Sequence, residues 1–281
     1  MSNGKNFQLN IRKFDISKIR SDATIVAIAP RRSGKSFLMR DILYHQRDIP
    51  IGVVMSGTEE ASPFFGDFMP KLFIHDNYDS SIISNLVKRQ TKIIEKSKEE
   101  KARYGHTNIN PNAFVILDDL MFDTSWVNDI EVKKLFMNGR HYKILYALTM
   151  QSPLGISPSL RDNIDYVFLL RCSKLSTRKK LYEHYAGMFP SFDAFCQVFD
   201  SCTENFECLV IDNTTRSNKI EDMVFWYKAK EPPAFKIGAP AFWQYAAANY
   251  DGSNEDGASE SLDNMNSGGR KNAPNIIINK Y

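Results

Sequence analysis

The feature that most constrains the fold of this chain is the segment A-P-R-R-S-G-K-S, which runs from Ala29 to Ser36. A short apolar, β-branched run, Thr24–Ala29, leads into it, and residues with helical spacing follow from Phe37 to Arg47. A strand, a glycine-containing loop and a helix in this order are typical of the phosphate-binding loop, or P-loop, of nucleotide-binding α/β domains. A chance G-K-S after a strand is the alternative.

Each residue type of this loop suits the binding of a nucleotide. Backbone N–H groups of the loop and of the helix N-terminus point at the phosphates, where the helix dipole favours negative charge. Gly34 lets the backbone approach closely, Lys35 places a charge on the β- and γ-phosphates, and the Ser36 hydroxyl is suited to ligate Mg²⁺. Ala29 stands where the consensus has glycine, which is the mildest replacement. We expect nucleotide contacts from Ala29, Pro30, Arg31, Arg32, Ser33, Gly34, Lys35, Ser36 and Phe37.

Apolar runs alternate with helical segments along most of the chain. Further strands are expected at 51–55, 72–75, 113–117, 144–149, 165–170, 207–211 and 223–227. Further helices are expected at 80–103, 127–138, 157–163, 176–185 and 191–199. Buried strands that alternate with helices indicate a mostly parallel sheet covered on both faces, so we expect a three-layer α/β fold.

A second motif, A-F-V-I-L-D-D, is a buried strand that ends in Asp118 and Asp119. A carboxylate at this place can hold Mg²⁺ through water, and an adjacent one can polarise the attacking water. We assign Asp118 to the metal, together with Ser36, and Asp119 to the water. Many ATPases with this layout have Glu at the second position. The alternative is that the two carboxylates only cap the next helix.

The segment N-G-R-H-Y-K-I-L-Y-A-L-T-M-Q-S follows the acidic strand and contains two further candidates. Gln151 ends its strand, where a polar side chain can sense the γ-phosphate or the water; a glutamine bonded only to backbone is the alternative. Arg140 precedes the strand and can act as an arginine finger on a neighbouring subunit's nucleotide. Arg161 is the rival for that role, and an ordinary surface arginine is the alternative for Arg140.

Taken together, these segments and S-P-S-L-R-D-N-I-D-Y-V-F resemble the poxvirus-type DNA-packaging ATPases of nucleocytoplasmic large DNA viruses, which belong to the FtsK–HerA superfamily. The resemblance covers about Asn10 to Tyr227. It implies a RecA-like core in which the strand bearing Gln151 lies between the P-loop strand and the acidic strand. It also implies that Arg140 holds the finger position and Gln151 the sensor position.

The resemblance also implies the partners and the setting of the protein. We expect ATP and Mg²⁺ as cofactors, a homo-oligomeric ring, and double-stranded DNA bound without sequence specificity. A capsid or membrane protein at the packaging vertex is a further expected partner, and the virion and the host-cell cytoplasm, in the viral factory, are the expected locations. The net charge of +3 does not by itself indicate a nucleic-acid binder. Basic clusters that could contact DNA are Lys88-Arg89, Lys96 to Arg103, Lys133-Lys134 and Arg178 to Lys180.

Composition indicates one domain with a tail. Residues 1–250 are expected to form a single P-loop ATPase domain, whereas residues 251–281 are rich in Gly, Ser, Asn and Asp and are expected to be disordered. Residues 237–250 are interpreted as a surface or docking segment. The four cysteines lack zinc-binding spacing, so we expect reduced, mostly buried thiols, as in intracellular proteins. We expect neither a signal peptide nor a membrane span.

These observations favour an ATP-driven double-stranded DNA translocase that packages a viral genome into a capsid. One alternative is another P-loop enzyme, a nucleotide or small-molecule kinase. A second alternative is a nucleotide-bound structural or assembly factor of the virion. The presence of Lys35, Ser36, Asp118 and Asp119 argues against the non-catalytic alternative, although Asp in place of the more usual Glu keeps it open.

Overall fold

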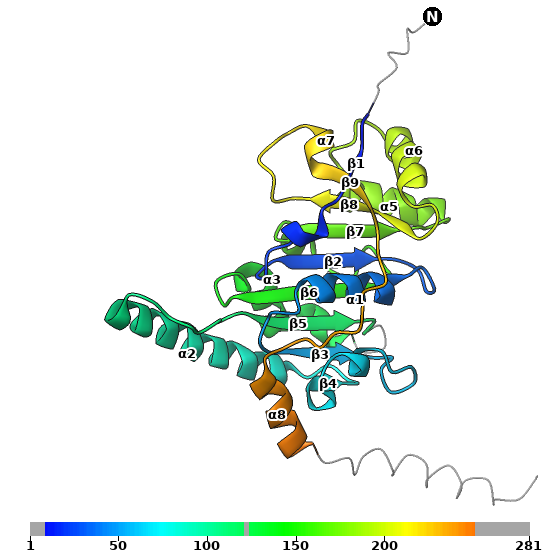
Figure 1. Cartoon of the computed structure of the whole chain (residues 1–281). Helices are drawn as coiled ribbons and strands as arrows, with labels where there is room; N and C mark the ends of the chain where they lie inside the picture. Colours follow the sequence, from blue (N-terminus) through cyan, green and yellow to red (C-terminus); the bar gives the residue numbers. More distant parts are fainter. Residues whose placement is uncertain (1–8, 121–123, 251–281) are drawn as a thin grey trace, which may run out of the picture.

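A central sheet organises the chain in the computed structural model, which describes residues 9–120 and 124–250. Within these residues, nine strands lie in the order β1-β9-β8-β7-β2-β6-β5-β3-β4 (Figure 1). All neighbouring strands pair in parallel except at β8, which is antiparallel to both β7 and β9. The strands are β1 (Arg12–Lys13), β2 (Thr24–Ile28), β3 (Gly52–Ser56), β4 (Ile74–His75), β5 (Ala113–Asp118), β6 (Ile144–Met150), β7 (Tyr166–Leu170), β8 (Glu207–Asp212) and β9 (Val224–Lys228).

Helices cover both faces of the sheet and give the expected three layers. The α-helices are α1 (Lys35–His45), α2 (Ser80–Tyr104), α3 (Ile130–Asn138), α4 (Pro158–Arg161), α5 (Leu175–Tyr185), α6 (Phe192–Cys202), α7 (Ile220–Met223) and α8 (Pro240–Asn249). In β2, Ile25 and Ala27 pack into the core shared with α1 and α8, whereas Val26 and Ile28 pack into the core shared with α2, α3, α5 and α6. Every residue of β2, β3, β5, β6 and β7 is buried, which explains their continuous apolar runs.

The strand order confirms the expected RecA-like arrangement. Strand β6 pairs with β2 on one side and with β5 on the other, so it lies between the P-loop strand and the acidic strand. Leu148 of β6 is in register with Val26 of β2 and with Leu117 of β5. The end of β6, just before Gln151, therefore lies between the two motifs that the sequence analysis singled out.

Two local predictions were wrong. The segment predicted as a strand at 72–75 is mostly a 3₁₀ turn, Lys71–Phe73, and pairs only at Ile74–His75. The helix predicted at 127–138 is interrupted: a 3₁₀ turn, Ser125–Asn128, comes first, and Asp129 then caps α3 by accepting a hydrogen bond from the Glu131 N–H. Competing side-chain hydrogen bonds of this kind end or start helices irrespective of apolar spacing.

The segment at 237–250 lies at the surface, as predicted; it contains helix α8, most of whose residues are exposed, and packs against its own chain through Ile237, Phe242 and Ala246. The Phe242 ring stacks on Phe73 with ring centroids 4.3 Å apart, and the Trp243 Nε1 donates a hydrogen bond to the Ile237 carbonyl. Strand β1, a two-residue strand at the edge of the sheet, was not predicted. Both elements depend on long-range pairing more than on their local sequence.

The remaining sequence-based expectations concern the cysteines, the membrane and the tail. All four cysteines are free thiols; Cys172, Cys202 and Cys208 are buried and Cys196 is half-buried, as expected. None of the described helices combines the length and the apolar character that crossing a bilayer requires. Residues 251–281, predicted to be a disordered tail, lie outside the described residues, and the division into one domain and a tail stays a prediction.

Candidate nucleotide-binding site

The candidate site lies at the carboxyl edge of the sheet, where β2, β6 and β5 end side by side. Ile28 is in register with Met150, and Thr149 with Asp118. The Ala29 N–H continues the ladder by donating to the Met150 carbonyl at 3.0 Å. Parallel pairing therefore brings together the P-loop, the acidic pair and Gln151, which are far apart in the sequence.

The P-loop backbone has the geometry that a close phosphate approach requires. Gly34 has a φ of +94°, a left-handed conformation that favours glycine, and forms the N-cap of α1. Arg32 also has a positive φ, of +59°. The Ser33 hydroxyl donates to the Pro30 carbonyl at 2.6 Å and closes the loop. Arg31 and Arg32 are exposed, so both guanidinium groups are accessible to an anion at the helix N-terminus.

Lys35 is held in the site as a buried cation. Its side chain is 9% exposed, and its Nζ has no hydrogen-bond partner among the described residues. The nearest carboxylate oxygen, Oδ2 of Asp119, is 3.9 Å away, which is an ion pair but too long for a hydrogen bond. Burial lowers the pKa of Lys35, and the charges of Asp119 and Asp118 oppose that shift. A buried ammonium without hydrogen bonds is costly, and phosphate oxygens would supply them.

Asp118 is buried at the end of β5 in a network of hydroxyl groups. The Thr149 Oγ1 donates to its Oδ1 at 2.5 Å, and the Ser56 Oγ donates to its Oδ2 at 3.3 Å. Burial raises the pKa of Asp118, although the Thr149 hydrogen bond and the charge of Lys35 oppose the rise. A nearby cation would favour its charged form. The sequence analysis did not name Thr149 or Ser56, although each is a lone hydroxyl at the end of an apolar strand.

Asp119 is half-buried and is bonded directly to the predicted sensor residue. The Gln151 Nε2 donates to both carboxylate oxygens of Asp119, at 2.7 Å and 2.8 Å. The Asp119 backbone has a φ of +48°, and its N–H donates to the Thr149 Oγ1 at 3.2 Å. Gln151 is thus not bonded only to backbone. The acidic pair does not cap α3 either, because Asp129 does.

These residues fit a magnesium–nucleotide complex. A glycine at the helix N-terminus, a buried ammonium without a hydrogen bond and a buried carboxylate whose pKa is raised are complementary to phosphate and Mg²⁺. The exposed Ser36 hydroxyl is in the first turn of α1. No group of three or more His, Cys, Asp or Glu side chains in the described ranges is arranged to hold a metal. A magnesium ion here would depend on phosphate and water oxygens as well, which is its usual preference.

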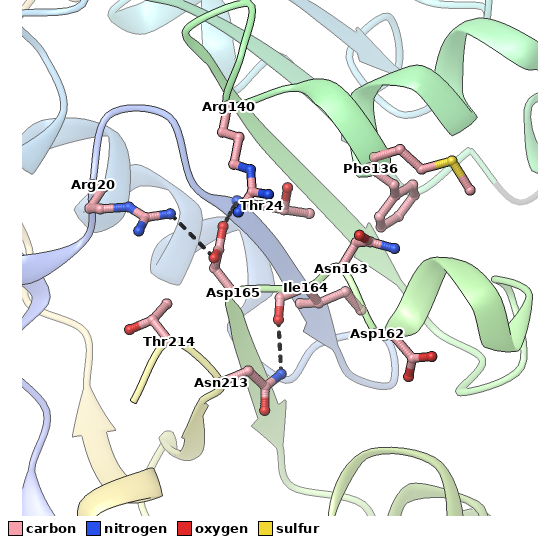
Figure 2. Close-up of a pocket in the computed structure, with 11 residues that line it drawn as sticks. Arg20, Thr24, Phe136, Arg140, Asp162, Asn163, Ile164, Asp165, Asn213 and Thr214 are labelled. Atoms are coloured by element: carbon pink, nitrogen blue, oxygen red, sulfur yellow. Dashed lines mark hydrogen bonds and ion pairs between the residues drawn. The ribbon is translucent and has the colours of Figure 1, made fainter. Parts of the chain in front are cut away.

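Arg140 lies at the opposite edge of the sheet, in the turn before β6. Figure 2 shows its side chain reaching into a hollow of about 310 Å³ that is also lined by Arg20, Asp165 and Asn213. Arg140 is exposed, and its guanidinium forms no hydrogen bond or ion pair with a described residue. Strand β6 has seven residues between Arg140 and Gln151, which is about 20 Å at 3.3 Å per residue. Arg140 therefore does not reach the nucleotide site of its own chain.

Arg161, the rival finger, is bound within its own chain. Its Nε and Nη2 both donate to the Ile156 carbonyl, at 3.1 Å and 2.9 Å, and its guanidinium lies 5.6 Å from the centroid of the Tyr185 ring. The Arg161 side chain therefore contacts its own turn and, through Tyr185, joins α4 to α5. Of the two arginines, Arg140 is the one that the structure leaves available to a partner.

A mostly parallel sheet with a P-loop after β2, an acidic pair at the end of β5 and a glutamine directly after the inserted β6 defines the P-loop NTPase fold of the RecA-like class. Within this class, uncharacterized protein L437 of Acanthamoeba polyphaga mimivirus is 44% identical over 236 residues, which cover 84% of this chain and 82% of that protein. Uncharacterized protein 088R of Invertebrate iridescent virus 3 is 38% identical over 79% of this chain and 83% of its own length. The chain belongs to the family that these proteins of nucleocytoplasmic large DNA viruses form. No family model matches the chain.

Solved structures with the same fold include other P-loop proteins. The pCW3 conjugation coupling protein TcpA, in monomer form with ATPγS, has a TM-score of 0.50 at 14% identity and covers 75% of this chain and 61% of its own. Thermomonospora curvata EccC has a TM-score of 0.50 at 12% identity over 84% of this chain and 42% of its own. The genome packaging NTPase B204 of Sulfolobus turreted icosahedral virus 2 has a TM-score of 0.46 at 14% identity, over 75% of this chain and 98% of its own. The first two likenesses support the fold.

Proposed function

We propose that this protein hydrolyses ATP with Mg²⁺ and uses the energy to move double-stranded DNA into a viral capsid. The observation that carries the hydrolytic part is the ammonium of Lys35, which is buried at the N-terminus of α1, forms no hydrogen bond with a described residue and has only a 3.9 Å ion pair with Asp119. Burying an ammonium that forms no hydrogen bond opposes folding, so a site that keeps such a group suits an anionic ligand. A triphosphate is the anion that this loop geometry fits.

The side chains divide the chemistry of hydrolysis among them. Lys35 and the loop amides stabilise the charge on the β- and γ-phosphates, and Ser36 with Asp118 holds Mg²⁺, which neutralises the same charge. Asp119 accepts a hydrogen bond from the attacking water and orients it. Gln151 donates to Asp119 in the structure. When ATP binds, we expect its amide to donate to the γ-phosphate instead.

The position of Arg140 supports the proposal of a ring of identical subunits. Its guanidinium is exposed at the amino edge of the sheet, and the P-loop is at the carboxyl edge. In a head-to-tail ring, the amino edge of one subunit faces the carboxyl edge of the next, so Arg140 would complete the neighbour's site. The motifs N-G-R-H-Y and T-M-Q-S, which resemble those of packaging ATPases, support this arrangement.

Helix α2 is the basic surface best placed to contact DNA phosphates. Lys88, Lys92 and Lys96 recur at intervals of four residues, are exposed, and make no ion pair with a described residue. They lie on a 25-residue helix that extends past the sheet in Figure 1. In the other clusters, Arg178 is paired with Asp200 and Lys134 with Glu131. Phosphate contacts of this kind bind DNA without reading its sequence.

The proposed partner at the packaging vertex is a capsid or membrane protein, and the proposed locations are the virion and the viral factory in the host-cell cytoplasm. These proposals rest on the motif resemblance and on the viral relatives. The test of the function itself uses the purified chain alone.

The deciding experiment is the steady-state ATPase rate of the wild-type protein and of Lys35→Ala, each with and without long double-stranded DNA. We expect a rate that DNA increases and that Lys35→Ala abolishes, because the ammonium is the only described cation buried at the phosphate site. An ATPase rate that DNA does not change and that a small-molecule phosphate acceptor increases would instead indicate a kinase. Absence of turnover in the assembled ring would indicate a structural role.

A further inference from the structure

An apolar pocket of about 440 Å³ opens directly beside the P-loop and has no part in the chemistry described above. Gly34, Phe37 and Leu38 line it from the start of α1, and Leu170 and Phe206 line it from β7 and the loop before β8. A Cβ placed on Gly34 would lie 3.7 Å from Cδ1 of Phe206, so the aromatic ring adjoins the glycine that caps α1. The pocket and the phosphate site therefore share a wall.

The ring of Phe206 is held there by the topology of the sheet. Because β8 is antiparallel, it begins at the carboxyl edge, where Cys208 pairs with Leu170. Asn205 and Phe206 both have left-handed backbones, with φ of +50° and +64°. Such conformations are uncommon for residues other than glycine and persist only where the surroundings fix them.

Phe206 is also 74% exposed, although most phenylalanines in the chain are buried. An exposed aromatic ring beside a ligand site gains nothing from burial in the free protein. It offers one face to any flat group that enters the pocket. Phe37, which is 40% exposed and follows Ser36, lines another wall.

We propose that this pocket holds the base of the nucleotide, with the Phe206 ring as its stacking platform; this rests on the proposed function of the P-loop. A nucleotide whose phosphates occupy the loop carries its base one ribose away, and the pocket is the apolar space that adjoins Gly34. Bases stack on aromatic rings irrespective of their hydrogen-bonding edges. The base would then be recognised by stacking in the pocket, and the phosphates by the charges of the P-loop.

The lining also predicts the selectivity of the site. Its side chains are apolar apart from Cys208 and Lys228, and none of them is an amide or a carboxylate that could read the edge of a base. The Cys208 thiol is already bonded to the Tyr227 carbonyl. A pocket without such groups discriminates weakly between ligands of similar shape. We infer that it accepts adenine and guanine alike and favours both over the smaller pyrimidines.

The test compares two ligands that share phosphates and differ in the base. Binding of ATP and of inorganic tripolyphosphate is measured with Mg²⁺ for the wild type, Phe206→Ala, Phe206→Trp, Lys35→Ala and Tyr245→Ala. Tyr245 is the matched control, an aromatic residue 59% exposed on α8. We expect Phe206→Ala to weaken ATP binding roughly tenfold and to leave tripolyphosphate binding unchanged. Phe206→Trp should retain ATP binding, and ATP and GTP should bind within about tenfold of each other.

The outcomes separate this inference from the proposed function. Unchanged ATP affinity in Phe206→Ala, or equal losses for ATP and tripolyphosphate, would overturn the base pocket. If Lys35→Ala leaves the binding of both ligands intact, the phosphate site itself is misassigned. A GTP affinity far below that of ATP would contradict the selectivity argument, because it would require a group that reads the base edge. Because Phe206 is exposed, its substitution is not expected to unfold the protein, and the thermal unfolding midpoint checks this.

Discussion

At the scale of single residues, the site contains charged groups whose burial destabilises the protein when no ligand is bound. Burial lowers the pKa of the Lys35 ammonium and raises the pKa of the Asp118 carboxyl group, so the charged form of each is disfavoured where it lies. Functional sites commonly show this pattern, since a ligand supplies the missing partner charge. The same residues are therefore expected to limit stability and to provide function.

Asp118→Asn is expected to stabilise the protein free of nucleotide and metal while abolishing hydrolysis. The folded pKa of Asp118 is raised above its ordinary value of 3.8, so its stabilising contribution is complete below that pH and is lost as the pH rises through the folded pKa. Asparagine stays neutral throughout and can still accept the Thr149 hydrogen bond. The measurement is the thermal midpoint against pH in the presence of a chelator. The exposed Asp48→Asn serves as control, and a lower midpoint for Asp118→Asn at neutral pH would contradict the argument.

Asp119→Asn is expected to bind ATP and to hydrolyse it at least about 100-fold more slowly, because removal of a general base typically costs two to four orders of magnitude. The affinity for ATP comes from the P-loop and is expected to be unchanged in Asp119→Asn. Asp119→Glu is the matched variant and should retain part of the rate, since a longer carboxylate still polarises water. Single-turnover hydrolysis measures the effect. Hydrolysis at the wild-type rate in Asp119→Asn would remove the water-activating role from this residue.

At the scale of elements, β6 connects the three parts of the site. Its position between β2 and β5 places Thr149 against Asp118 and Gln151 against Asp119. The Thr149 hydroxyl donates to the Asp118 carboxylate and accepts from the Asp119 backbone N–H, so a single side chain contacts both acidic residues. Strand β6 is thus a structural link between the acidic pair and the end of the P-loop strand.

Thr149→Val is expected to destabilise the fold by about 1–3 kcal/mol and to slow hydrolysis, because it leaves a buried carboxylate without its shortest hydrogen bond at nearly the same volume. Chemical denaturation measures the first effect and single-turnover kinetics the second. Ser56→Ala is the comparison, with a smaller expected effect, since the Ser56 hydrogen bond to Asp118 is longer, at 3.3 Å. Equal effects of the two substitutions would contradict the predicted ranking of the two hydrogen bonds, and no effect of Thr149→Val would show that its hydroxyl is not needed.

At the scale of the whole molecule, the two edges of the sheet carry complementary halves of one proposed site. The carboxyl edge holds the P-loop and the acidic pair, and the amino edge exposes Arg140 in the hollow shown in Figure 2. A single chain cannot join them, because the length of β6 separates them. Assembly is therefore the step that would complete the active site.

Arg140→Ala is expected to be inactive alone and to regain activity when mixed with Lys35→Ala. In a mixed ring, a Lys35→Ala subunit supplies Arg140 to a neighbour whose own P-loop is intact. ATPase rates across mixing ratios measure this rescue. Arg161→Ala is the control: it removes hydrogen bonds to the Ile156 carbonyl within its own subunit, so it should lower stability and show no such pattern. If no mixture regains activity, Arg140 does not act on a neighbouring subunit.

The sequence alone determined the class of the protein and most of its elements. The P-loop, the acidic strand and the order of strands and helices are local patterns, because apolar periodicity and the residues of a loop depend on neighbours along the chain. Asp118, Asp119 and Gln151 could be assigned since each ends an apolar run. The two local errors, at 72–75 and 127–138, arose where side-chain hydrogen bonds or packing from elsewhere overrode that periodicity.

Only the tertiary structure decided which of these residues meet. The bond between Gln151 and Asp119 and the double contact of Thr149 follow from the placement of β6 beside β5. The exposure of Arg140 and the position of Phe206 follow from which sheet edge each loop joins, and the antiparallel β8 brings Phe206 to the P-loop. Strand order is set by contacts between distant segments, whose free energies depend on the whole core, and no local pattern in the chain encodes it.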